Sequence, residues 1–313
     1  MTDTRPKEAP GSHIYRSTTG IDYDSVPFRL WDKSKKLFWD PADIDFTQDV
    51  RDWAEMTEEQ RLMVAGQARG FMVGEEAVTI DILPLLRAMS EQGRLEDTMY
   101  LTMFAMEEAK HIDFFRRWFD AVGFDASVGL QQQQGNGDGY GGGGGGNGYA
   151  ADGQMDPFES LNRIMKRLDN DPSPKRILDA TLLYNHLIEA VFAIAGYRRW
   201  EAAFATLEGK LQGFQTGLRN IQRDERRHIA YGTYLARRII SENPDLWPWV
   251  EQRWAKMCGP LLTGEMGDEI SADLAKRRLE VLAVARGQSS DDVEHNTDID
   301  DFEPEGMPAD VTV

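Results

Sequence analysis

The sequence predicts an all-α protein built as one large helical bundle. Alternation of apolar and polar residues, the pattern of a strand, is nearly absent. Long segments instead carry helix-capping residues, and Thr57 with Gln60 fits a capping box. Two copies of Glu-x-x-His add a third sign, because residues three apart share one face of a helix. With 313 residues, 41% of them hydrophobic, the chain can bury a sizeable core.

The helices can be placed along the chain from these signals. A long helix is expected over about 57–90, weakened by glycines and bent near Pro84. A second is expected over about 94–121, ending at Gly123. Further helices are predicted at about 156–169, 173–206, 208–241, 244–258 and 266–286.

Three segments have compositions that do not support a packed core. Residues 1–25 are polar and are expected to be disordered. Residues 125–155 are rich in Gly and Gln and are predicted to form a disordered surface insertion. Residues 287–313 are acidic and are expected to form a disordered tail. The sequence therefore predicts a single domain over 26–286, interrupted by the insertion.

The charge of the chain limits its partners. The formal net charge is −18 and the pI about 4.7, so the surface repels the phosphates of nucleic acids. We therefore expect no nucleic-acid partner. Many carboxylates, with Arg favoured over Lys, are typical of proteins from salt-adapted (halophilic) organisms. An ordinary acidic protein with an acidic tail is the alternative.

Features that place a protein outside the cytoplasm are missing from the sequence. Cys258 is the only cysteine, which excludes an internal disulfide framework. No apolar run approaches the ~18 residues needed to span a bilayer. The first residues lack the apolar segment of a secretory signal. We expect a cytoplasmic protein with no transmembrane segment.

Two short motifs carry the chemistry. Glu108 and His111 form one Glu-x-x-His, and Glu225 and His228 form the other. Each pair shares a helix face and can hold one metal ion, and carboxylate with imidazole suits iron, manganese or zinc. One such motif often lies on a solvated helix face. Two copies in a chain with five histidines favour a metal site.

Each motif is preceded by a further glutamate at a similar distance. Glu75 lies 33 residues before Glu108, and Glu189 lies 36 residues before Glu225. Both spacings fit one helix, a turn and an antiparallel return. The result is an internal pseudo-repeat with the ligand set of the ferritin-like di-metal carboxylate proteins. The resemblance to this ligand set implies the fold class, a ferritin-like helical bundle with a di-metal carboxylate centre.

The neighbours of these glutamates argue against solvated salt bridges. Glu75 follows Phe71, Met72 and Val73, and Glu189 lies between Ile188 and Ala190. A carboxylate on an apolar face is costly unless it is paired or binds a metal. The sequence therefore favours buried ligands.

The charge of the predicted ligands suits a reaction with O₂. Four carboxylates neutralise two divalent ions, whereas two trivalent ions leave a charge of +2 that calls for a bridging oxide or an anionic ligand. Asp224 precedes Glu225 and can accept the outer N–H of a ligand histidine, most plausibly His111. The alternative for Asp224 is a surface acid beside Arg223.

Four motifs resemble those of the R2-like ligand-binding oxidases, within the ribonucleotide reductase small-subunit superfamily. They are GEEAVT at 74–79, FAMEEAKH at 104–111, YNHLIE at 184–189 and DERRH at 224–228. The resemblance covers about 25–285 except for the Gly/Gln insertion. In that family the first Glu of GEEAVT is the ligand, which selects Glu75 over Glu76.

The resemblance implies a specific chemistry. The family assembles a mixed manganese–iron centre, or a di-iron one, and activates O₂. It binds a long-chain fatty acid at the metals and forms a valine–tyrosine ether cross-link. The corresponding residues here are Val78 and Tyr184. Without the resemblance they read as a core valine and a buried, hydrogen-bonded tyrosine. A homodimer is also expected.

Two alternatives remain open beside an O₂-dependent oxidase of unknown substrate. One is a ribonucleotide reductase small subunit, but Phe115 stands where such subunits usually carry the radical tyrosine. The chain also has no tyrosine after Tyr234 to relay a radical. The other is a metal- or lipid-binding protein without turnover.

The position of Tyr184 makes a structural prediction. It lies five residues before Glu189, so in a regular helix the two side chains would point about 140° apart. We therefore predict a π-type turn between them, a feature that clusters at functional sites. We also expect an apolar tunnel that ends at the metals on the side of Val78 and Phe192.

Overall fold

The structure is a computed structural model that describes residues 16–18, 20–127, 157–264 and 268–299. Every regular element in these ranges is a helix, and none of the residues described is in a strand. The predicted all-α class is confirmed. Most of the predicted insertion at 125–155, together with residues 1–15 and 300–313, lies outside the described ranges.

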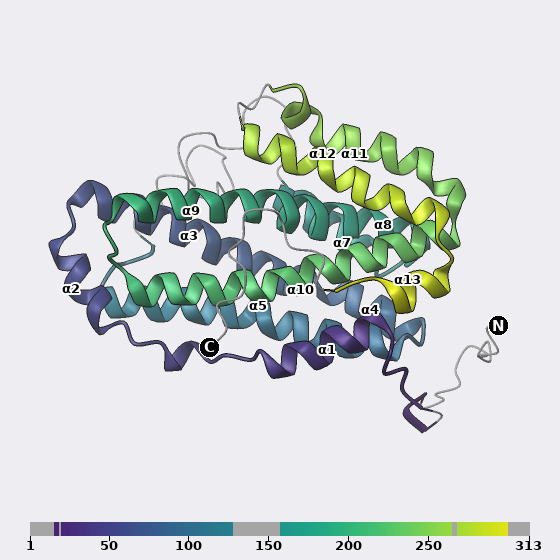
Figure 1. The fold of residues 1–313 in the computed structure, drawn as a ribbon, viewed down its shortest axis with the longest axis horizontal. Helices are drawn as coiled ribbons and strands as arrows, with labels where there is room; N and C mark the ends of the chain where they lie inside the picture. The colour runs from purple at the N-terminus through teal and green to yellow at the C-terminus, as the bar shows by residue number, and fades with distance from the viewer. Residues whose placement is uncertain (1–15, 19, 128–156, 265–267, 300–313) are drawn as a thin grey trace.

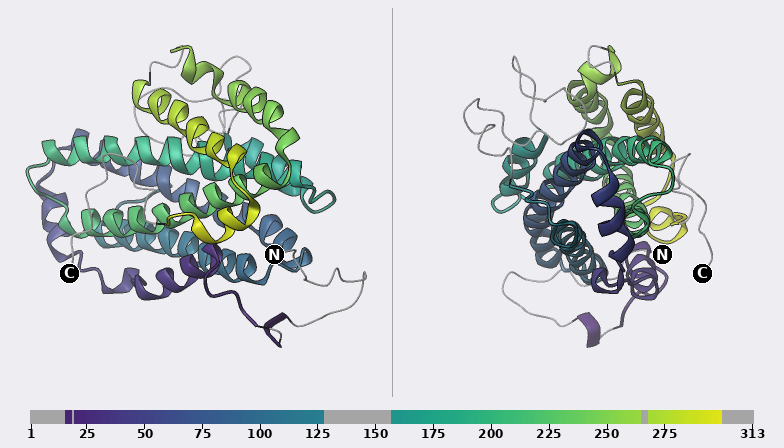
Figure 2. Two further views of the ribbon diagram at one scale, coloured as in Figure 1. Left: turned by 45° about the vertical axis from the view of Figure 1, so that its right-hand side comes forward. Right: turned by 90° about the vertical axis from the view of Figure 1, so that its left-hand side faces the viewer.

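Four long helical segments lie side by side in a bundle (Figure 1). Two come from the first half of the chain and pack on each other, and two come from the second half and do the same (Figure 2). The segments are α3 (Glu58–Asp81), α5 (Leu95–Val122), the run α8 (Pro174–Thr181), η3 (Leu182–Ala193) and α9 (Ile194–Thr206), and α10 (Gln212–Glu242).

Shorter helices cover this bundle. The helices α11 and α12 lie together on one side, at the top of Figure 1, and α1 runs along the opposite edge. The bounds are η1 (Arg16–Thr18), α1 (Val26–Lys36), η2 (Pro41–Asp43), α2 (Thr47–Glu55), α4 (Leu83–Glu91), α7 (Pro157–Arg167), η4 (Pro244–Leu246), α11 (Trp247–Leu262), α12 (Glu269–Ala283), η5 (Val284–Gly287) and α13 (Ser290–Asn296).

Helix ends follow the local chemistry. Thr57 and Gln60 form the predicted capping box of α3, and Gly123 ends α5 in the left-handed conformation with φ 66°. The prediction of a single helix over 57–90 was wrong in one respect. The segment forms two helices, because Pro84 lies in the first turn of a new helix, α4. At that position a backbone N–H would have no partner within the helix, so its absence in proline costs nothing.

The helix that carries the second motif is capped by a distant carboxylate. Asp49 of α2 accepts the backbone N–H groups of Gly213 at 2.8 Å and Phe214 at 2.7 Å, at the start of α10. It also accepts the indole N–H of Trp118 at 3.2 Å. A Cβ on Gly213 would lie 2.7 Å from the Asp45 carbonyl oxygen, so only glycine allows this approach. The contact fixes the start of α10 against α2 and α5.

The π-type turn predicted around Tyr184 is confirmed, and it is longer than one turn. The element η3 is a π-helix of 12 residues that contains both Tyr184 and Glu189. It lies against α10 at a close approach: a Cβ on Gly232 would lie 2.1 Å from Cβ of Asn185. The π-helix is therefore packed closely against α10 at this point.

The expectation of a disordered tail from residue 287 was wrong for its first part. Ser289 caps the helix α13, and Val293 is buried against the bundle. Arg29 of α1 donates to the carbonyl oxygens of His295 at 3.1 Å and Thr297 at 2.7 Å. These contacts hold the segment in a folded conformation although its composition is acidic. At the other end, residues 20–25 are also described, and Ser25 caps α1.

One stretch, Pro174–Thr206, has the length and composition of a membrane-spanning helix. The sequence analysis did not detect this stretch, because it looked for an uninterrupted run of apolar residues. In the structure 89% of the most apolar 18-residue part of this stretch is buried inside the protein, as in the core helix of a bundle.

Candidate metal centre

The four bundle segments bring together all six predicted metal ligands. Each is buried, the most exposed being Glu75 at 6%. They form two groups that share Glu108 and Glu225, and the potential ligand atoms within each group lie within 4.8 Å of one another. The first group is Glu75, Glu108, His111 and Glu225, and the second is Glu108, Glu189, Glu225 and His228.

Both histidines direct the same ring nitrogen at the carboxylates. His111 Nδ1 lies 3.3 Å from Glu75 Oε2 and 3.5 Å from carboxylate oxygens of Glu108 and Glu225. His228 Nδ1 lies 3.3 Å from Glu108 Oε1 and 3.6 Å from Glu225 Oε2. The two shared carboxylates therefore lie between the imidazoles, where each can bridge two ions.

The donor atoms fit metal ions. Glu108 Oε2, Glu189 Oε1 and His228 Nδ1 are buried and have no hydrogen-bond partner in the described part of the chain. Buried polar atoms without partners are costly and uncommon in proteins. A cation within each group would satisfy them, and carboxylate with imidazole is a suitable set for manganese, iron or zinc.

The electrostatics of the cluster point the same way. Burial and repulsion from neighbouring carboxylates raise the pKa of Glu75 and Glu189 well above the usual range of glutamate. Burial opposes a charged imidazole, but Glu75, Asp224 and Glu108 together outweigh it and raise the pKa of His111 well above the ordinary value. Glu108, Glu225 and Glu107 together likewise outweigh burial and raise the pKa of His228. The site therefore attracts positive charge, as protons or as metal ions.

Asp224 lies where the sequence placed it. Its Oδ2 is 3.2 Å from His111 Nε2, the outer nitrogen of that ring. The same oxygen accepts the indole N–H of Trp39 at 2.7 Å and lies 2.8 Å from the Lys110 ammonium. Trp39 and Lys110 were not foreseen from the sequence. Together these contacts hold His111 with Nδ1 turned toward the carboxylates.

Glu107 is a further residue of the site that sequence reasoning missed. Its Oε2 lies 3.0 Å from His228 Nε2, as Asp224 lies beside His111. Arg227 donates to both acids. A signal was present in the sequence, because an acidic residue precedes the Glu of both Glu-x-x-His motifs.

Of the two residues for which the resemblance implies a cross-link, Tyr184 contacts the cluster directly. The Tyr184 hydroxyl donates to Glu108 Oε1 at 3.1 Å, and Val78 is buried one helical turn after Glu75 on α3. Asn185, the next residue of η3, donates to Glu189 Oε2 at 2.9 Å. The π-helix thus lets Tyr184 and Glu189 face one centre. Phe115 is buried among aromatic rings.

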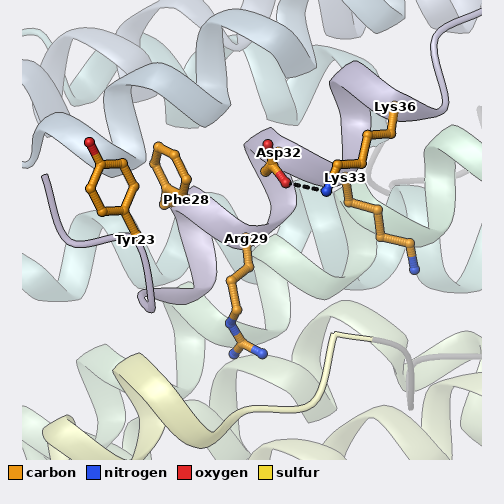
Figure 3. A pocket seen from close by; sticks show the side chains of 6 residues that line it. All are labelled: Tyr23, Phe28, Arg29, Asp32, Lys33 and Lys36. Atoms are coloured by element: carbon orange, nitrogen blue, oxygen red, sulfur yellow. Dashed lines mark ion pairs between the residues drawn. The ribbon is translucent and has the colours of Figure 1, made fainter.

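A separate hollow of about 200 Å³ lies on the surface of α1 (Figure 3). None of the predicted site residues lines it. Its walls are Tyr23, Phe28, Arg29, Asp32, Lys33 and Lys36.

The fold and the buried cluster define the class: a ferritin-like helical protein whose carboxylates and histidines fit two metal ions. The family model of the ribonucleotide reductase small chain matches residues 20–128. An R2-like ligand-binding oxidase from Sulfolobus acidocaldarius is similar in structure, with 30% identity and a TM-score of 0.75; the match covers 90% of this chain and 98% of that one.

A second solved structure supports the same assignment. It is a glycine-to-phenylalanine variant of an R2-like ligand-binding oxidase with an anaerobically reconstituted Mn/Fe cofactor. It shares 30% identity with a TM-score of 0.69, and the match covers 89% of this chain and 99% of that one. The chain belongs to the R2-like ligand-binding oxidase family.

Proposed function

We propose that this protein is an O₂-dependent oxidoreductase whose six clustered residues bind manganese and iron, or two irons. One observation carries the proposal: two overlapping groups of buried ligands share Glu108 and Glu225, and several of their donor atoms have no other partner. The Mn/Fe cofactor of a similar solved structure supports the heterodinuclear form.

Each residue has a defined part in this proposal. The metal ions would supply electrons for the reduction of O₂. Glu108 and Glu225, which belong to both ligand groups, would hold both ions, and Glu75 with His111, and Glu189 with His228, would each complete the set for one ion. Asp224 and Glu107 orient the imidazoles through their outer nitrogens.

The proposed ligand is a long-chain fatty acid. Its carboxylate would offset half of the charge of +2 that remains when two trivalent ions meet four glutamates. Its chain would lie on the side of Val78 and Phe192, both of which belong to or pack against the hydrophobic core. A dissociable lipid without product would instead favour a binding protein without turnover.

The proposed oxidation of the protein itself joins Val78 to Tyr184. An ether bond forms between the Tyr184 oxygen and a carbon of Val78 as the O–H and C–H bonds break, and the two protons and two electrons released pass to O₂. The bound metal ions would supply the other two electrons that reduce O₂ to water. The tyrosine oxygen is suitably held, because its hydroxyl donates to Glu108. The product is lighter than the two separate side chains by two hydrogens.

Mass spectrometry tests the function. Metal-free protein is loaded with iron and manganese, exposed to O₂, digested and also extracted with organic solvent. We expect a joined Val78–Tyr184 peptide pair and a fatty acid in the extract. Tyr184→Phe and an anaerobic sample are the controls. If both peptides keep their unmodified masses, the proposed cross-link is refuted.

The assembly proposed is a cytoplasmic homodimer. Large apolar side chains are exposed on the outer faces of α3, α4 and α5: Leu62 at 55%, Ile80 at 57%, Leu83 at 53% and Met106 at 42%. A second copy of the chain would cover such a surface. Light scattering should give twice the mass of 35.4 kDa.

A further inference from the structure

A row of buried tyrosines extends from the metal centre toward α13. Tyr100 of α5 and Tyr231 and Tyr234 of α10 have side chains that are 0% exposed. The ring centroids of Tyr100 and Tyr231 are 5.0 Å apart, and those of Tyr231 and Tyr234 are 5.9 Å apart. The three rings therefore form one continuous aromatic path.

Phe104 connects this path to the centre. Its ring stacks on His228 with centroids 3.7 Å apart and lies 6.0 Å from the ring of Tyr100. Aromatic contacts thus run without a break from a predicted metal ligand to Tyr234. An electron can cross such short gaps between rings rapidly.

The two outer tyrosines each have a base. Tyr231 donates its hydroxyl proton to Asp97 Oδ1 at 3.0 Å, and Tyr234 donates to Glu294 Oε2 at 2.9 Å. A phenol that loses an electron becomes a strong acid, so its oxidation needs a nearby proton acceptor. Glu294 is partly exposed, with a side chain at 17%, so it can exchange protons with solvent.

The Asp97 carboxyl is suited to accept and return a proton. Burial raises its pKa to about 6, against the attraction of Arg94. Arg94 donates to Asp97 at 2.8 Å, to Glu294 at 2.7 Å and to the Tyr234 oxygen at 2.9 Å. This guanidinium therefore holds both acceptors and Tyr234 in one arrangement.

Two other buried tyrosines lack this feature. The hydroxyls of Tyr100 and Tyr197 have no hydrogen-bond partner within the described ranges. Tyr197 also lies near the centre, with its ring 5.1 Å from Phe71. Burial alone therefore does not explain the paired acids beside Tyr231 and Tyr234, and Tyr197 serves as a matched control.

We propose that Tyr231 and Tyr234 form a one-electron relay that removes oxidising equivalents from the metal centre when no substrate consumes them. The relay rests on the proposed reaction with O₂, which supplies the oxidant. Tyr231 gives one electron toward the centre through Tyr100 and Phe104, and its proton passes to Asp97.

The relay then returns to its starting state. Tyr234 gives an electron to the Tyr231 radical, which regains its proton from Asp97, and the Tyr234 proton passes to Glu294. A one-electron reductant of the ascorbate class reduces the Tyr234 radical at the surface, and Glu294 returns the proton. Each cycle consumes one electron from the reductant and one oxidising equivalent from the centre.

Photo-oxidation of metal-free protein tests the relay without the oxidase reaction. A ruthenium polypyridyl label is attached to Ser290→Cys, an exposed position of α13. The native Cys258 is buried and does not compete, since burial raises its thiol pKa to about 12. A flash then oxidises the nearest competent tyrosine, and radical absorbance and electron paramagnetic resonance report the yield.

We expect a tyrosyl radical whose yield falls at least tenfold when Tyr231→Phe and Tyr234→Phe are combined. Tyr197→Phe should leave the yield unchanged. Circular dichroism confirms that the variants fold, as phenylalanine keeps the ring. Equal yields in all variants, or an equal loss in Tyr197→Phe, would overturn the relay.

A second measurement shows whether the centre uses the relay. Iron-loaded protein with ring-deuterated tyrosine is mixed with O₂ and freeze-quenched, and O₂ consumption is followed in parallel. We expect a radical signal narrowed by deuterium that is lost in Tyr231→Phe. Normal O₂ consumption with no tyrosyl radical overturns the relay alone. Absence of O₂ consumption refutes the oxidase, and the photo-oxidation result then decides the relay.

Discussion

Replacing Glu108 with alanine should remove metal from both positions at once. Glu108 belongs to both ligand groups, so its loss takes one donor from each. It also leaves three carboxylates to balance two divalent ions, which places one uncompensated positive charge in a buried site. The fold should largely persist, because removing one of several like charges relieves repulsion in the metal-free state.

The size of the effect follows from the buried charge. Breaking a buried ion pair costs about 3–5 kcal/mol. Each 1.4 kcal/mol corresponds to about a tenfold change in affinity, so metal affinity should fall by roughly two to three and a half powers of ten. His228→Ala, which removes a donor from the second group only, should also lower the bound metal.

Elemental analysis after dialysis against a competing chelator measures the outcome, and circular dichroism checks the fold. Glu76→Ala is the matched control, because Glu76 is adjacent to Glu75 but exposed. We expect two metals per chain in the control and fewer in the variants. Two metals per chain at unchanged affinity in both Glu108→Ala and His228→Ala would refute the assignment.

Three further predictions concern affinity, pH and salt. Glu107→Gln should weaken metal binding about 10–100-fold by disturbing His228, with Glu76→Gln unchanged in the same titration. Metal-free protein should lose unfolding free energy as the pH rises above the ordinary glutamate pKa of 4.5, because Glu75 and Glu189, whose pKa is raised by folding, then hold protons only in the folded state. Thermal unfolding with and without metal checks this, and a pH slope that metal leaves unchanged contradicts it. The unfolding midpoint should also rise from low to molar salt, where a Debye length of ~3 Å screens the net charge of −18; a constant midpoint favours an ordinary acidic protein.

Helical periodicity explains why the cluster could be predicted. The Glu-x-x-His spacing places each pair on one face whatever the surrounding fold, and the similar distances to Glu75 and Glu189 imply antiparallel returns. The geometric conflict between Tyr184 and Glu189 likewise predicted a π-type turn. Its length could not be predicted, because it depends on packing such as that of Gly232 against Asn185.

Features that depend on tertiary contacts were missed. Composition marked the residues after 287 as a tail, yet α13 is held by Arg29 and by the Glu294–Arg94 ion pair, 200 residues apart in sequence. The role of Glu107 also depends on the register between α5 and α10. Neither contact leaves a periodic pattern in the sequence.

The two metal positions have unequal surroundings. Asp224, behind His111, contacts Trp39 and Lys110, whereas the second position has Tyr184 and Asn185 beside it. The first position therefore has an extra cation close to its histidine. This difference supports the proposal that two different metals are bound.

The halves of the chain complete each other at the site. Asp224, from the second half, holds His111 of the first, and Glu107, from the first half, holds His228 of the second. Arg227 contacts both acids and so joins the two arrangements. Neither half can orient its own histidine, so the repeats must be docked before either metal position is formed.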